Sequence, residues 1–240
     1  MPRGYNDYQN PVNQVAGRLV DFAGIQTAQL GVCQLDGLGR LVWLDKFGEG
    51  LGGWQLYTLG AGIIPAVTSA TAEIPPSCLI LGVAGGIAGD ISGLQRSFLF
   101  TQPWACGVDF AVLYNQGNNR LDMNLYSVRS LVLSWIRVRY IPNLGTISIM
   151  VAGGTTVYLT LTAAASDRLW IPIKLVADFE AGTGKRLVVG TQSISLVDIP
   201  ITGGPTLEPD QLYMTINAEA LGAGSLNQYV GHVYLTVDEP

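Results

Sequence analysis

The chain has 240 residues, of which 48% are hydrophobic and only 13% are charged, with 30 glycines and 12 prolines. Average globular chains carry about 25% charged residues, so much of this surface is either neutral and polar or covered by other protein. The net charge is −5 and no Lys or Arg follows Arg186, so a basic face for nucleic acid is not expected. No stretch reaches the roughly 18 apolar residues of a membrane-spanning helix, so no membrane contact is expected.

Residues 1–37 are predicted to be an N-terminal arm and lead-in segment, because their first half is polar and lacks periodicity. No apolar segment follows the first ten residues, so no signal peptide is predicted. Tyr5 and Tyr8 are the candidate residues by which this arm docks on a neighbouring subunit. The alternative is a frayed chain terminus.

Residues 38–240 are predicted to form one all-β domain of short antiparallel strands. The first two strands, 41–47 and 54–59, flank a turn rich in glycine. Further strands are expected at 77–83, 97–101, 107–114, 120–128, 131–141, 146–152, 155–162, 212–218 and 229–237. No helix and no internal repeat are predicted, and this strand spacing is typical of a β-sandwich or barrel.

The segment 170–197 carries the strongest strand pattern. Ile171, Ile173, Leu175, Ala177 and Phe179 alternate with residues of a second face that includes Lys174 and Asp178. Glycine turns near 182–184 and at 190 separate three strands. This pattern predicts a meander with a buried face, on which Leu175 and Phe179 lie, and a solvated face, on which Lys174 and Asp178 lie.

Three motifs resemble concanavalin-like and carbohydrate-binding-module jelly rolls, as found in phage virion structural proteins. They are the run from Asp45 and Phe47 through Gly50 to Trp54, the segment WIPIKLVADFEAGTGKRLVVG, and the closing strand NQYVGHVYLTVDE. The resemblance implies an antiparallel jelly-roll-like β-sandwich with an extended N-terminal arm. It also implies a candidate structural calcium site at Asp45, Glu49 and Asp238, with Glu239 nearby. Gly231 and His232 stand where related modules often carry an acidic pair, so the expected cofactor is none and the alternative is this calcium.

No catalytic residue is predicted, and the protein is expected not to be an enzyme. His232 is the only histidine, lies in a predicted strand and has no nucleophile motif near it. The E-x-D-x-x-E signature of concanavalin-like hydrolases is absent. Cys33, Cys78 and Cys106 are widely spaced, which favours neither a disulfide framework nor a zinc site.

Two functions fit these features. The first is a structural subunit of a phage-like virion (a capsid, decoration or tail component) that is located in the virion and forms a homo-oligomer, with a trimer favoured, alongside other virion proteins. The low charge, the polar arm and the absence of a signal peptide support it. The alternative is a carbohydrate-binding module or adhesin, in which Trp104, in a loop-like setting, is the candidate sugar-stacking residue. The fold itself hosts both functions.

Overall fold

The computed structural model describes residues 39–69, 77–98, 105–113, 118–151, 154–160, 170–190, 192–197, 199–201 and 203–239. These residues form 16 β-strands and one short 3-10 helix, η1 (Pro142–Leu144). Every strand pairing among them is antiparallel. No helix in these ranges has the length and hydropathy needed to cross a membrane.

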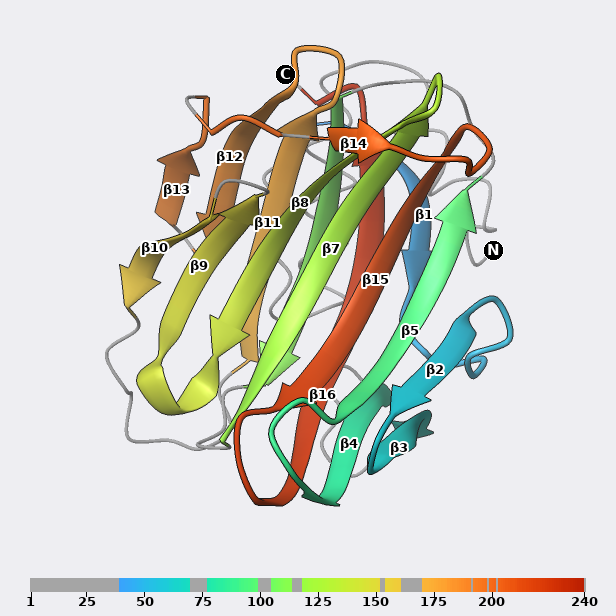
Figure 1. Cartoon of the computed structure of the whole chain (residues 1–240), viewed down its shortest axis with the longest axis vertical. Helices are drawn as coiled ribbons and strands as arrows, with labels where there is room; N and C mark the ends of the chain where they lie inside the picture. The colour runs from blue at the N-terminus through green and yellow to red at the C-terminus, as the bar shows by residue number, and fades with distance from the viewer. Residues whose placement is uncertain are drawn as a thin grey trace, which may run out of the picture.

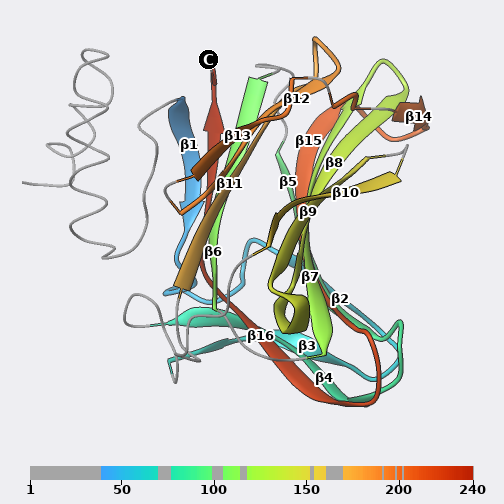
Figure 2. The same cartoon turned by 90° about the vertical axis from the view of Figure 1, so that its left-hand side faces the viewer.

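The strands form two sheets that pack face to face (Figures 1 and 2). Sheet A contains, in spatial order, β13 (Gln192–Ser195), β12 (Thr183–Val189), β11 (Trp170–Asp178), β6 (Ala105–Leu113), β16 (Gly224–Val237), β4 (Cys78–Gly86) and β3 (Gly62–Thr68), with β1 (Arg40–Asp45) paired to β16. Sheet B contains β10 (Gly154–Thr160), β9 (Thr146–Val151), β8 (Val132–Ile141), β7 (Asn119–Arg129), β15 (Gln211–Ala220), β5 (Ile91–Phe98) and β2 (Gln55–Leu59), with β14 (Gly203–Pro205) paired to β8. The predicted jelly-roll-like β-sandwich is confirmed.

The core lies between the sheets and follows the period-two alternation of the sequence. On β7, Leu121, Met123 and Leu125 are fully buried in it. The intervening residues, including Asp122 and Asn124, therefore lie on the outer face of sheet B. Figure 2 shows sheet B curved so that this outer face is concave.

The predicted meander at 170–197 is present as β11, β12 and β13. Leu175 is buried as expected, but Phe179 lies beyond the end of β11 and is only partly buried. Lys174 lies on the expected face, yet it is 2% exposed because its Nζ lies 2.8 Å from Glu239 Oε1. The prediction that Lys174 is solvated is therefore wrong, whereas Asp178 is partly exposed and caps the following turn through Glu180 N–H.

β3 and β14 were not predicted, and β5 and β16 begin well before their expected starts at 97 and 229. β3 includes Pro65 at a register shift on the edge of sheet A, where a missing N–H is tolerated. β14 is a strand of three residues, two Gly and one Pro, that pairs with β8. β5 begins at Ile91, well before the expected start, because Ser92 and Gly93 pair with Ala218 and Asn217 of β15.

Candidate functional site

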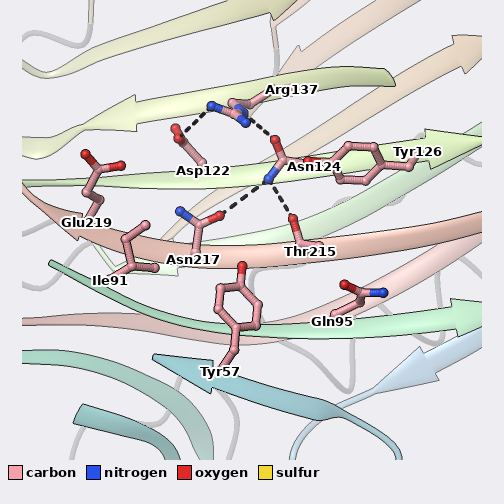
Figure 3. Close-up of a pocket in the computed structure, with 10 residues that line it drawn as sticks. All are labelled: Tyr57, Ile91, Gln95, Asp122, Asn124, Tyr126, Arg137, Thr215, Asn217 and Glu219. Carbon is pink, nitrogen blue, oxygen red and sulfur yellow. Dashed lines mark hydrogen bonds and ion pairs between the residues drawn. The ribbon is translucent and has the colours of Figure 1, made fainter. Parts of the chain in front are cut away.

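A hollow of about 380 Å³ opens on the concave outer face of sheet B (Figure 3). Its lining comes from five strands: Tyr57 of β2, Ile91 and Gln95 of β5, Asp122, Asn124 and Tyr126 of β7, Arg137 of β8, and Thr215, Asn217 and Glu219 of β15. The antiparallel register aligns these residues in rows across the sheet. Asp122 lies opposite Arg139 and Asn217, and Asn124 lies opposite Arg137 and Thr215.

Asp122 is the electrostatic centre of the site. Its carboxylate is 1% exposed and accepts hydrogen bonds from Arg139 Nε at 2.8 Å and Arg139 Nη2 at 2.9 Å. Arg137 Nη1 lies 3.2 Å and Arg120 Nε 3.6 Å from Asp122 Oδ2. The hydrogen bonds to Asp122 raise the pKa of Arg139 above its ordinary value. Both oxygens of this carboxylate are therefore occupied by guanidinium groups.

Asn124 connects Arg137 to β15. Its Oδ1 accepts a hydrogen bond from Arg137 Nε, and its Nδ2 donates to Thr215 Oγ1 at 2.7 Å and to Asn217 Oδ1 at 3.4 Å. Figure 3 shows these side chains as a connected network along the floor of the hollow. Asn124 is only 1% exposed, so it orients the side chains that it bonds to and does not itself contact solvent.

Tyrosine residues border the network. Burial raises the pKa of Tyr57 to about 12, so its phenol remains a neutral hydrogen-bond donor at neutral pH. Tyr126 and Tyr213 stack in parallel with ring centroids 4.4 Å apart. Burial also raises the pKa of Tyr213, with a further contribution from Glu208. The hollow thus combines aromatic surface with fixed polar groups, as small-molecule sites do.

Glu219 is the second carboxylate of the hollow. It accepts a hydrogen bond from Arg120 Nη2, and its side chain is 16% exposed. Arg120 therefore contacts both Glu219 and Asp122. Two carboxylates and three guanidinium groups meet at one end of the site.

The structure does not bring the calcium candidates together. Asp45 Oδ1 accepts from Phe47 N–H and its Oδ2 from Trp54 Nε1, so Asp45 holds the turn after β1. Asp238 pairs with Arg40, at the opposite end of β1 and thus about 15 Å along the strand from Asp45. Glu49 lies exposed in the turn. Among the described residues, no group of three or more His, Cys, Asp or Glu side chains has the arrangement of a metal site.

His232 lies on β16 of sheet A, away from the hollow. It is fully buried, its Nε2 lies 3.4 Å from Asp109 Oδ1, and its ring stacks on Tyr234 with centroids 4.5 Å apart. These contacts are consistent with the structural role expected for it. Tyr5, Tyr8 and Trp104 lie outside the described residues, as does the predicted arm.

Sequence reasoning missed the hollow. The sequence predicted no role for Arg137, Asp122, Asn124 or Glu219. The available signal was that two predicted strands with one apolar face, 120–128 and 131–141, both carry charges on the other face. Glu219 had no such signal, because its partner Arg120 is 99 positions away in the chain.

No family model matches the chain, and no curated protein matches its sequence. Its structure is similar to the catalytic domain of an endo-1,3-beta-glucanase (laminarinase) from Thermotoga petrophila RKU-1, with a TM-score of 0.54 and 10% identity over 84% of this chain and 99% of that one. It is also similar to an endo-beta-1,3-glucanase from Pyrococcus furiosus, with a TM-score of 0.55 and 12% identity over 86% of this chain and 98% of that one. A sialidase matches with a TM-score of 0.56 and 9% identity, over 84% of this chain but only 19% of the sialidase.

At these identities the likeness shows the fold alone. The jelly-roll fold that the resemblance implies is confirmed, and these structures give no support to the virion part of the resemblance. The expectation that the protein is not an enzyme is contradicted at the level of the fold, because structures that share this fold include glucanases. That expectation relied on a missing linear motif, whereas the two carboxylates of the hollow come from β7 and β15, which are distant in sequence.

Proposed function

We propose that the protein binds a saccharide in the hollow on the outer face of sheet B. The observation that carries this proposal is the hollow's lining, in which buried side chains bond to one another and hold further polar groups and tyrosine rings at a concave surface. Saccharides present hydroxyl groups and apolar ring faces, which match fixed polar groups and aromatic rings. The fold shared with two glucanases supports the same site class.

Calorimetric titration with oligosaccharides tests the proposal, beginning with a 1,3-β-glucan hexasaccharide because the similar glucanases are named for that polymer. Tyr57→Phe and Gln95→Ala each remove one hydrogen-bonding group from the hollow and are expected to weaken binding about 2- to 10-fold. Gln192→Ala, at an exposed position of β13 in sheet A, is the matched control and should bind as the unmodified protein does. Absence of saccharide binding, or equal binding by all variants, would refute the proposal.

The same titrated mixtures should be assayed for new reducing ends. Asp122 and Glu219 both line the hollow and both contact Arg120. Glycoside hydrolysis uses two carboxyl groups about 5 to 10 Å apart. If sugar is released, Glu219→Gln should abolish release while saccharide binding persists.

A structural role in a phage-like virion is the second candidate, and exposed apolar side chains near the turn that joins β2 to β3 favour protein contact there. Leu59, Ile63 and Ile64 are 60%, 46% and 66% exposed, at the edges of the two sheets. Light scattering on the full chain and on a variant lacking residues 2–18 tests assembly and the arm together. A trimer that becomes a monomer on truncation would support both, and two monomers would refute both.

A further inference from the structure

The charges around the hollow do not balance. Arg120, Arg137 and Arg139 supply three positive charges, and Asp122 and Glu219 supply two negative ones, so one positive charge is in excess. The chain as a whole has a net charge of −5. The hollow is therefore a locally cationic region in an acidic protein, which is a distribution that attracts anions.

The geometry identifies Arg137 as the residue that carries the excess charge. Arg139 binds Asp122 through two nitrogens at 2.8 and 2.9 Å, and Arg120 binds Glu219. The contact between Arg137 and Asp122 is longer, at 3.2 Å, and uses only Nη1. Among the described residues, Arg137 Nη2 has no hydrogen-bond partner, whereas Arg139 is 12% exposed and already doubly bonded.

The guanidinium of Arg137 is also held in place. Its Nε donates to Asn124 Oδ1, and its central carbon lies 5.5 Å from the ring centroid of Trp135. Its side chain is 23% exposed and lines the hollow. A fixed guanidinium with free N–H groups binds carboxylate or sulfate oxygens in a forked geometry without losing much side-chain freedom.

We infer that the saccharide bound in this hollow carries an anionic group, a carboxylate or a sulfate, which Arg137 binds. This inference rests on the proposed saccharide function and names the ligand class of the same site. Glu219 keeps its Oε1 without a partner among the described residues and accepts a hydroxyl hydrogen of the same ligand. The anionic group binds next to Arg137 rather than next to Arg120, because Glu219, which is paired with Arg120, repels it there.

The test compares three hexasaccharides by calorimetric titration: a galacturonate, a sulfated carrageenan fragment and neutral cellohexaose. At low salt, one anionic probe should bind about 10-fold or more tightly than the neutral one, since charge-assisted hydrogen bonds are stronger than neutral ones. Raising salt from about 20 to about 300 mM should reduce that preference, because the site is partly exposed. Comparing the affinities for the galacturonate and the carrageenan fragment shows whether the site prefers a carboxylate or a sulfate.

Arg137→Gln should bring the anionic and neutral affinities within about 2-fold of each other. Arg40→Gln is the control, because it removes the same charge at a site 56% exposed on β1 of sheet A and should leave the preference intact. Arg137→Lys keeps the charge without the fork and should retain part of the preference. If Arg137→Gln does not fold, the salt dependence and Arg137→Lys still decide the matter.

The outcomes separate this inference from the proposed function. Equal affinity for neutral and anionic probes overturns the inference and leaves saccharide binding standing. An equal loss of preference in Arg40→Gln and Arg137→Gln overturns it as well, because the preference would then come from overall charge. Failure of every probe to bind overturns the proposed function itself.

Discussion

Asp122→Asn should destabilise the fold by about 3 kcal/mol, because Asp122 neutralises a group of arginines on the outer face of sheet B. The substitution keeps the size of the side chain and one acceptor oxygen but removes the charge. Three guanidinium groups would then face only Glu219 as counter-charge. The effect therefore measures the electrostatic part of the cluster rather than a loss of packing.

Two estimates give the same magnitude. Removing one partner of a buried ion pair costs about 3 to 5 kcal/mol, and the lower end applies because Arg139, Arg137 and Arg120 are 12%, 23% and 24% exposed and regain water. Independently, Asp122 accepts three charge-assisted hydrogen bonds, at 2.8, 2.9 and 3.2 Å. Asn keeps only one acceptor oxygen, so at least one of these bonds is lost and the others no longer go to a carboxylate; at about 1 kcal/mol each, the total is about 3 kcal/mol.

Urea unfolding followed by tryptophan fluorescence measures the change, with an unchanged slope against denaturant as the check on two-state behaviour. Asp238→Asn is the matched control: its pair with Arg40 is exposed, at 53% and 56%, and should contribute less than about 1 kcal/mol. Asn also tolerates the positive φ of 56° found at Asp238. If Asp122→Asn and Asp238→Asn destabilise equally, the arginine cluster is a solvated surface feature and the reasoning fails.

Three further predictions concern single groups. Burial raises the pKa of Tyr57 to about 12. The stability that its neutral phenol contributes is therefore complete below the unfolded pKa of about 10 and is lost as pH rises toward 12. Ultraviolet titration should show one tyrosine that ionises at about pH 12, and this ionisation should be missing in Tyr57→Phe. Burial also raises the pKa of the Cys106 thiol to about 12, so in a variant with Cys33→Ser and Cys78→Ser a thiol reagent at neutral pH should label Cys106 only after unfolding, and labelling of the native protein would contradict this. Glu239→Gln removes the carboxylate bound by Lys174 and should cost about 3 kcal/mol in urea unfolding, whereas a change under about 1 kcal/mol would contradict its burial.

The fold could be predicted because strand alternation is a local property. On β7, Leu121, Met123 and Leu125 are spaced by two and all enter the core, as the sequence pattern indicates. The same holds for Ile173 and Leu175 on β11. Alternation shows which residues share a face, and predicting which residues form the core requires little more information than that.

Burial on the outer face could not be predicted in the same way. Lys174 alternates with the core residues of β11, so its pattern indicates exposure, yet Glu239 from the end of the chain reaches it. Glu239 is 65 positions after Lys174 in the chain, and no periodicity connects the two residues. The partners of charged residues on a strand can be identified only when the order of the strands in the sheet is known.

The hollow depends on strand order in the same way, and this dependence ties recognition to stability. β7 lies between β8, its neighbour in sequence, and β15, so Asn124 bonds to Arg137 on one side and to Thr215 on the other. The contacts that direct Arg137 into the site are therefore also contacts that hold sheet B together. Substitutions in this network should change folding and binding at once, while a substitution of Gln95, which lines the hollow from β5, should change binding alone. Comparing these two groups of variants separates what the cluster contributes to the fold from what it contributes to a bound saccharide.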